Sequence, residues 1–410
     1  MAHGPRWGRI PRFGRTARTR GVGRTTRTGG VGRTIRTGGV GRTAHTGGVG
    51  RTARIAGVGR TTRTSRFSRT TRIVLCSLLG LLLLAGGAAA YTWHRLNQNI
   101  TGVELGSLLT PAASATSDLN ILVVGSDSRA GKNATRAGGG DDTGRSDTTL
   151  LLHVYGGRKK AALVSIPRDT IVDRPACTTA SGRKLEAREG VMFNSVYETG
   201  GAPCTVAAVE SLTGGLHVNH YVEVGFNGFA ELMDALGGTD VTLAKPIDDK
   251  ESGLHLAAGR HHLNGQQALD LVRTRHGVGN GSDLGRIQLQ HQFLTALIGR
   301  IAGGNLLTDP ARLFDVADSA TKSLTTDTSL AHVGNLASLA YSMRGLGARD
   351  VQMVTLPAQL EQGDEDRLVP DSARVAKVWA ALKADRPVPE DALTGTASVP
   401  NGIGQVVMPG

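Results

Sequence analysis

Three arginines surround a glycine-rich break in the stretch LVRTRHGVGNGSDLGRIQLQ, which runs from Leu271 to Gln290. Arg273 and Arg275 precede the break, and Arg286 follows it at the start of a predicted helix. Guanidinium groups bind phosphate oxygens in a bidentate manner, and the first turn of a helix favours anions. Two interpretations stay open from this pattern alone: a solvated arginine surface, or a site for a strongly anionic ligand.

Acidic and basic residues also stand where strands are predicted to begin or end. Asp127 follows the apolar run LNILVVG, Asp147 opens the next run, and Arg168 follows the third in SIPRDT. Two carboxylates at neighbouring strand ends can hold one Mg²⁺, with water and phosphate oxygens completing its shell. Each aspartate taken alone is more simply a capping or surface residue.

Several other chemistries are excluded by spacing. The segment GSDSRAGKN lacks the P-loop pattern, because five residues separate Gly125 from Gly131 and Asn133 follows the lysine. The sequence contains no HExxH zinc motif and no GxSxG nucleophile elbow.

The elements that position these residues alternate between strand and helix patterns. Residues 119–125 predict a strand buried on both faces, and residues 148–154 and 161–166 predict a hairpin. Helical spacing follows in residues 226–238, 263–273 and 284–301. We therefore predict an α/β domain at residues 118–385, with a central mixed β-sheet flanked by helices on both faces. Residues 386–410 are predicted to form a flexible tail.

The basic charge of the chain lies in its first 72 residues. This segment has 18 arginines and no lysine, aspartate or glutamate, and it repeats Val-Gly-Arg-Thr every nine residues from Val22 to Val58. Such a segment has too little apolar surface to fold, so residues 1–72 are predicted to be disordered. With almost no aromatic residues for base stacking, attraction to a membrane surface is favoured over nucleic-acid binding.

A membrane-spanning helix is predicted at residues 73–92. Residues 73–91 form an uncharged run of 19 residues, which is long enough to cross a bilayer. A cleavable signal peptide is the alternative, but 72 residues are too many to precede one. The arginine-rich segment then predicts a cytoplasmic N-terminus, with a stalk at residues 93–117 and the α/β domain outside. In an oxidising compartment Cys177 and Cys204 form either a disulfide or two buried thiols.

The motifs, taken in order, resemble the LytR-CpsA-Psr family. They are NILVVGSDSR, GRSDTTLLLHV, AALVSIPRDT, FNSVYETGG, VGFNGFAELMDALGGTDVTL, LNGQQALDLVRTRH and DLGRIQLQHQ. The resemblance covers about residues 119–301, with a helical continuation to about 385. In high-GC Gram-positive members of the actinobacterial type a disulfide in this region is common, which favours pairing Cys177 with Cys204.

The resemblance implies a membrane-anchored phosphotransferase of EC 2.7.8 type. It would move a glycopolymer from a polyprenyl diphosphate carrier to the C6 hydroxyl of N-acetylmuramic acid in peptidoglycan, using Mg²⁺ or Mn²⁺. Which polymer it carries stays open among teichoic acid, capsule, arabinogalactan and other glycans. The implied metal-binding residues are Asp127 and Asp147. The implied diphosphate-binding residues are Arg129, Arg168, Arg273, Arg275, Arg286 and Gln290, and Asp283 is implied to support them. Asp127 or Asp169 is the expected proton acceptor.

One departure from the family pattern concerns the run Asp-x-x-Arg-x-x-Arg-Gln-Gln. Leu289 and His291 stand where the second arginine and the second glutamine are usual, which puts outer phosphate or sugar contacts in doubt. Two other functions remain as alternatives. One is a membrane-tethered transcriptional regulator whose arginine tail binds DNA, and the other is a polyprenyl diphosphate phosphatase with water as acceptor.

Overall fold

The computed structural model describes residues 68–114, 116–127, 144, 146–274, 283–303, 309–393 and 406–407. The predicted disordered segment lies outside this part of the chain except for residues 68–72, which begin the first helix. Helix α1 (Arg69–Asn99) is capped by the Ser68 side chain, and by length and composition it can cross a membrane. It continues seven residues beyond the predicted span of residues 73–92.

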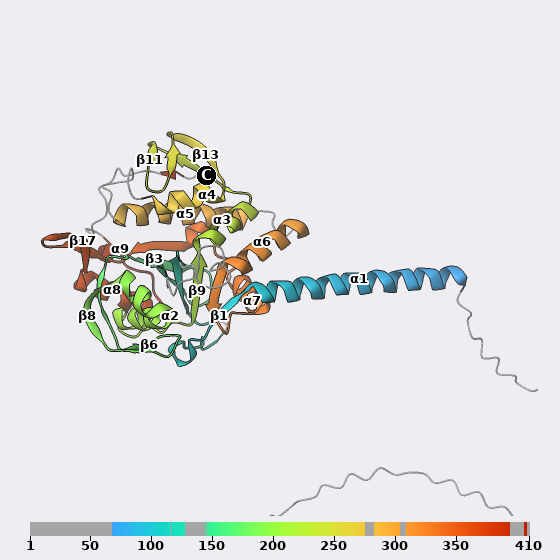
Figure 1. The fold of residues 1–410 in the computed structure, drawn as a ribbon, viewed down its shortest axis with the longest axis horizontal. Coiled ribbons are helices and arrows are strands. Elements are labelled where there is room, and N and C mark those ends of the chain that lie inside the picture. Colours follow the sequence, from blue (N-terminus) through green and yellow to red (C-terminus); the bar gives the residue numbers. More distant parts are fainter. Residues whose placement is uncertain are drawn as a thin grey trace, which may run out of the picture. The chain divides into compact units, whose positions relative to one another are not determined.

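A seven-stranded sheet forms the centre of the α/β domain (Figure 1). Strands β1 and β14, β9 and β2, and β4 and β15 pair in parallel, whereas the remaining neighbours are antiparallel. The predicted mixed sheet and the predicted hairpin are therefore confirmed. In spatial order the strands are β1 (Thr101–Val103), β14 (Leu324–Asp327), β9 (His220–Gly225), β2 (Leu119–Ser126), β3 (Ser146–Val154), β4 (Ala161–Ile166) and β15 (Val351–Thr355).

Helices cover both faces of this sheet because its strands are apolar on both sides. Leu122 and Val124 of β2 pack in the largest core cluster with helix α2 (Phe193–Leu212) and helix α8 (Ser372–Lys383). Ile121, pointing the other way, belongs to a cluster that also contacts helix α7 (Val333–Ser342). Burying apolar side chains on both faces is the main force that holds this three-layer arrangement together.

A second, smaller core lies beside the sheet and carries the helices of the arginine-rich stretch. It is built from helix α3 (Phe226–Ala235), helix α4 (Gly265–Arg273), helix α5 (Asp283–Gly303) and the antiparallel strands β10 (Thr239–Leu243) and β13 (Gly259–Leu263). Asn264 caps α4 in a capping box with Gln267. A Cβ atom at Gly265 would collide with the carbonyl of Ala230, so this glycine lets α4 pack closely on α3.

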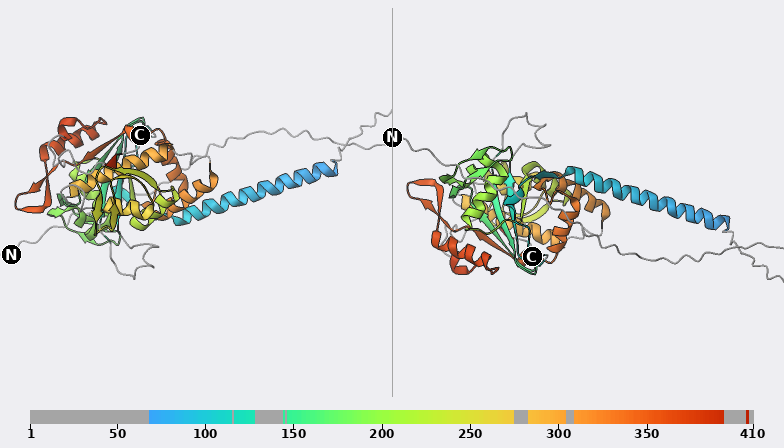
Figure 2. Two further views of the ribbon diagram at one scale, coloured as in Figure 1. Left: turned by 90° about the horizontal axis from the view of Figure 1, so that it is seen from above. Right: turned by 90° about the horizontal axis from the view of Figure 1, so that it is seen from below.

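Smaller elements complete the described part of the chain. They are η1 (Gly106–Leu108), β5 (Ile171–Arg174), β6 (Cys177–Thr178), β7 (Lys184–Leu185), β8 (Arg188–Met192), β11 (Ile247–Asp249), β12 (Leu254–Leu256), α6 (Pro310–Ser323), η4 (Ala348–Asp350), β16 (Ala358–Glu361), β17 (Asp364–Pro370), α9 (Glu390–Leu393) and β18 (Val406–Val407). Figure 2 shows the same elements from above and below.

Two predicted boundaries need correction. Residues 93–117, predicted as a stalk, contain the last turns of α1, strand β1 and η1, and β1 pairs with β14 at the edge of the central sheet. The tail predicted from residue 386 begins too early, because Val388 and Ala392 are buried in the largest core cluster.

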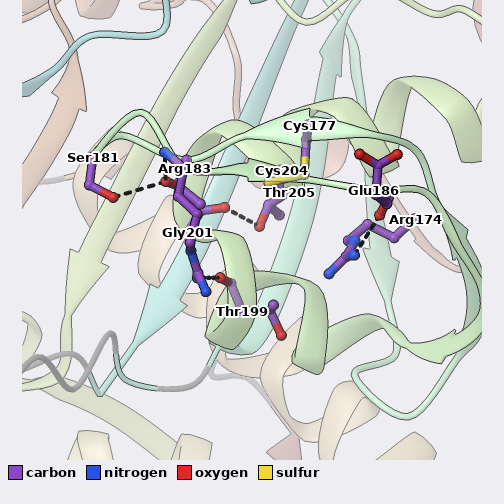
Figure 3. The surroundings of a disulfide bond; sticks show 10 residues. Arg174, Cys177, Ser181, Arg183, Glu186, Thr199, Gly201, Cys204 and Thr205 are labelled. Atoms are coloured by element: carbon purple, nitrogen blue, oxygen red, sulfur yellow. Dashed lines mark hydrogen bonds between the residues drawn. A yellow bond between two sulfur atoms is a disulfide. The ribbon is translucent and has the colours of Figure 1, made fainter.

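Cys177 and Cys204 form a disulfide that joins β6 to α2 (Figure 3). Their Cα atoms lie 5.4 Å apart. Beside it, Arg183 Nη2 donates a hydrogen bond to the Thr199 carbonyl over 2.8 Å. The crosslink and this bond tie the excursion from β5 to β8 onto the helix that covers the sheet.

Candidate active site

The candidate site lies at the end of the hairpin formed by β2 and β3. Gly125 pairs with Thr148 and Ser126 pairs with Ser146, so Asp147 is the additional residue of a β-bulge. Bulges redirect side chains at sheet ends. Asp127 follows β2 directly and is exposed, so the two predicted metal-binding aspartates flank the same pair of strand ends.

Arg168 connects this bulge to the end of β4. Its Nη1 donates a hydrogen bond to Asp147 Oδ1 over 3.0 Å, and its Nε lies 3.3 Å from Asp169 Oδ1. All three side chains are partly buried, which weakens screening by water and strengthens their interaction. The structure thus brings Asp147, Arg168 and Asp169 into contact at one end of the sheet.

Arg286 and Gln290 approach the same bulge from α5. Four residues apart, they share one face of the helix. Arg286 Nη2 donates to the Asp147 carbonyl over 2.9 Å, and Gln290 Nε2 donates to Thr148 Oγ1 over 3.2 Å and to the Val272 carbonyl over 2.9 Å. Arg286 is 3% exposed and Gln290 is 6% exposed. Gln290 therefore joins β3 to the end of α4.

Arg273 is the last residue of α4 and lies at the same site. Its guanidinium carbon lies 5.2 Å from the centre of the Phe226 ring, a cation–π contact that orients the charged group. The side chain remains exposed. Arg275, Arg129 and the side chain of Asp283 fall outside the described residues, so their predicted roles stay predictions.

A pocket of about 160 Å³ opens between these groups. Two arginines give it positive charge, and the acidic residues Asp147 and Glu251 also line it. Its lining residues are Asp147, Thr148, Phe226, Glu251, Ser252, Val272, Arg273, Arg286 and Gln290. Such a mixture suits a ligand with phosphate groups and hydroxyl groups.

Two further pocket residues, Glu251 and Ser252, carry no motif in the sequence. They lie in the turn between β11 and β12, where Asp249 Oδ1 accepts hydrogen bonds from the amides of both residues at 2.9 and 3.3 Å. Ser252 Oγ lies 2.9 Å from Thr274 Oγ1, directly after Arg273. The letters DDKESG predict a turn, but nothing in them indicates that this turn reaches α4.

Leu289 and His291, the two departures from the expected motif, point away from the pocket. Leu289 is 1% exposed and belongs to the second core. His291 Nε2 lies 2.7 Å from Ser165 Oγ on β4, and burial lowers the pKa of this histidine to about 4. The imidazole is therefore neutral near pH 7 and shares this hydrogen bond with the Ser165 hydroxyl. Both residues serve packing, and the pocket-lining Arg286 and Gln290 are retained.

A buried acid supports the end of β2. Glu223 accepts hydrogen bonds from the hydroxyl groups of Tyr197 at 2.7 Å and Tyr221 at 2.9 Å, and Ser126 also bonds to it. Burial raises the pKa of Glu223, and these hydrogen bonds partly oppose that effect. Because Ser126 immediately precedes Asp127, this network fixes the strand end from which Asp127 extends.

The acidic side chains at this site could supply some of the ligands of a magnesium ion. Among the described residues there is no cluster of three or more histidine, cysteine or acidic side chains suited to a metal. Mg²⁺, however, is commonly bound by one or two carboxylates together with water and substrate phosphates. Asp127 and Asp147 meet that requirement by type and by their common strand end.

Comparison with known proteins decides the family. A model of the LytR_cpsA_psr family matches residues 92–384. The chain belongs to the LytR-CpsA-Psr family. It is 34% identical over 279 residues to the cell wall biosynthesis protein LcpA of Corynebacterium glutamicum, covering 62% of this chain and 52% of LcpA. The chain thus matches about half the length of this relative.

Other relatives of the LytR-CpsA-Psr family agree in sequence and fold. A Bacillus cereus protein named polyisoprenyl-teichoic acid–peptidoglycan teichoic acid transferase TagU is 31% identical over 240 residues, covering 57% of this chain and 71% of TagU. The crystal structure of Bacillus subtilis TagV superposes with a TM-score of 0.52 at 26% identity, covering 66% of this chain and 97% of TagV. The predicted family and fold class are confirmed.

Proposed function

We propose that this chain is a phosphotransferase that attaches a glycopolymer to peptidoglycan. The donor is a polyprenyl diphosphate lipid that carries the polymer, and the acceptor is the C6 hydroxyl of N-acetylmuramic acid. The observation that carries the proposal is the pocket in which Arg273 and Arg286 face the Asp147 bulge. The name of the relative TagU describes the same class of reaction.

The arginines are suited to a diphosphate because of their position as well as their charge. Arg286 is almost fully buried, so its interaction with an anion is weakly screened. Arg273 is exposed and stacks on Phe226, so its guanidinium can bind the second phosphate. Groups fixed before the reaction stabilise the charge that develops in the transition state.

Asp127 and Asp147 would hold Mg²⁺, or Mn²⁺ in its place. The ion supplies positive charge that neutralises the phosphate oxygens. Arg168 holds one oxygen of Asp147 through a hydrogen bond. This contact fixes the orientation of the carboxylate and limits its rotation, as outer partners of metal ligands generally do.

In the proposed step the acceptor oxygen attacks the phosphorus next to the sugar. A new P–O bond forms as the bond from that phosphorus to the bridging oxygen breaks, and polyprenyl phosphate leaves with the electron pair. The proton of the acceptor hydroxyl passes to Asp127 or Asp169. Glu251 would repel phosphate oxygens, so we assign its side of the pocket to the hydroxyl groups of the acceptor.

The proposed topology places the pocket outside the cell. Residues 1–72 carry 18 arginines, and the positive-inside rule assigns such a segment to the cytoplasm. The disulfide between Cys177 and Cys204 suits an oxidising compartment.

The test is an assay of the full chain in liposomes with a synthetic diphosphate-linked glycan, with and without peptidoglycan fragments. Transfer of the glycan phosphate to the fragments supports the proposal. Release of glycan phosphate at the same rate with and without fragments contradicts it, because it would identify a phosphatase. Arg273→Ala should abolish transfer, and Arg260→Ala on exposed β13 is the matched control.

A further inference from the structure

Helices α1 and α6 run side by side in the same direction where α1 ends. Arg95 donates from Nε and Nη2 to the two carboxylate oxygens of Asp318 over 3.1 and 3.0 Å. Asn99 Nδ2 donates to Asp318 Oδ1 over 2.9 Å and contacts Thr321 Oγ1 at 3.2 Å. Residue numbers thus rise together along both helices, which defines a parallel pairing.

Helix α7 holds the same end of α1 from another side. The amide of Val333 donates to Asn97 Oδ1 over 2.9 Å. A Cβ atom at Gly334 would lie only 3.2 Å from the Trp93 ring, so the indole packs closely on this part of α7. Contacts with both α6 and α7 leave the last two turns of α1 no freedom to act as a flexible linker.

The length of α1 determines how far its contacts with α6 and α7 lie from the hydrocarbon core of a membrane. The uncharged run of residues 73–91 spans about 28 Å as a helix, close to the roughly 30 Å hydrocarbon core. Arg95 stands about 6 Å beyond Tyr91 along the helix, and each headgroup layer is about 5 to 8 Å thick. The guanidinium of Arg95 lies over the Phe314 ring at 5.6 Å. Because the two helices run in parallel, the residues one turn before Phe314 on α6 lie at the same height along the membrane normal as Tyr91, one turn before Arg95 on α1. The first residues of α6 are therefore level with Tyr91.

The surface at this level is partly apolar. Leu313 on α6 is 38% exposed and Ile301 near the end of α5 is 49% exposed. The two helix ends are neighbours, because Arg312 and Arg300 both donate to the carbonyl of Leu236, over 2.6 and 3.3 Å. Exposed apolar side chains beside arginines are typical of surfaces in the membrane interface.

We propose that the surface formed by Ile301, Arg312 and Leu313, here named the α5–α6 rim, rests in the headgroup layer of the bilayer that α1 spans. The partner is the phospholipid surface itself. The apolar side chains gain contact with the lipid boundary, and α1 holds the rim at the required depth. The height of the catalytic pocket above the membrane is then fixed by the fold and is independent of any linker.

The test measures contact of the rim with lipid headgroups in the full chain. Cys76→Ser removes the free thiol, and Leu313→Cys or Ile301→Cys then carries a fluorescent label in liposomes that contain a headgroup-linked nitroxide lipid. Leu360→Cys is the matched control, because Leu360 is 50% exposed on the β16–β17 hairpin, at the opposite side of the domain from α1 in Figures 1 and 2.

We expect strong quenching of both rim labels and little quenching at residue 360. Rim labels that are quenched no more than the control, at either position, overturn the proposal. Both variants lie on exposed positions, so the label does not disturb a core. The measurement reports no catalysis, and its outcome is therefore independent of the proposed transferase activity.

Discussion

Arg286 donates a hydrogen bond from Nη2 to the main-chain oxygen of Asp147 over 2.9 Å, although the two residues are 139 positions apart in the sequence. The contact sets a buried guanidinium on the bulge that also carries the Asp147 carboxylate. This bond uses the main-chain carbonyl, whereas the Asp147 carboxylate accepts a hydrogen bond from Arg168. The proposed diphosphate site uses both groups, the guanidinium for the phosphates and the carboxylate for the metal.

Arg286→Lys should lower the rate of transfer roughly a hundredfold, as loss of one fixed donor to a developing charge commonly does. Lysine keeps the charge but not the planar fork that contacts the carbonyl and the ligand together. The measurement is the transfer rate at saturating donor, with the melting temperature recorded in parallel. Arg260→Lys is the control. An unchanged rate for Arg286→Lys would remove this residue from the site.

Asp147→Asn should raise the Mg²⁺ concentration needed for half-maximal transfer by roughly tenfold or more, since even outer partners of metal ligands contribute that much. The amide keeps the size of the side chain and loses its charge. A magnesium titration of the transfer rate tests this, with Asp315→Asn on exposed α6 as control. If the titration curves of the variant and the unmodified protein coincide, Asp147 does not bind the metal.

Glu251→Gln should raise the KM for the peptidoglycan acceptor roughly tenfold, the loss expected for one hydrogen bond to a charged group. The KM for the lipid donor should not change, because we assign Glu251 to the acceptor side of the pocket. Asp248→Asn, on the same hairpin and exposed, is the control. A rise in the donor KM instead would place Glu251 on the other side of the reaction.

Leu289→Arg restores the arginine usual in the family motif, and we expect it to destabilise the protein by roughly 3 kcal/mol or more. Leu289 is buried in the second core, where an unpaired charge is costly. Leu289→Met, which conserves volume, should cost less than about 1.5 kcal/mol. Thermal unfolding in detergent compares the two variants. A stable Leu289→Arg protein with faster transfer would mean that this position faces the substrate.

His291→Gln should change how stability depends on pH. Burial lowers the pKa of His291 to about 4 in the folded protein, whereas an unfolded chain has the ordinary value of about 6.5. As pH falls from 6.5 to 4, the unfolded state binds a proton that the folded state does not, so stability is lost. The loss is on the order of 3 kcal/mol.

Glutamine can keep the hydrogen bond to Ser165 without titrating. The melting temperature of the unmodified protein should therefore fall more steeply than that of His291→Gln between these pH values. Other titrating groups act equally on both proteins, so the difference between the two curves reports His291. Parallel curves would show that this imidazole titrates normally.

The sequence by itself determined the strands β2, β3 and β4 of the central sheet, and the family. A continuous apolar run such as residues 119–125 is typical of a strand in a sheet that is covered by helices on both faces. The hairpin formed by β3 and β4 follows from the turn residues between them. The ordered motifs also identified Asp147, Arg168, Arg273 and Arg286 as members of one site before any contact was known.

Only the tertiary structure decided how these residues meet. The bulge at Asp147 depends on the register between two strands, and the roles of Leu289 and His291 depend on which helix face meets which core. Glu251 reaches the pocket because a turn packs against the end of α4. The docking of α1 rests on Arg95 and Asp318, which are 223 residues apart. Sequence periodicity reports which face of an element is buried, whereas its partner is selected by packing of the whole chain.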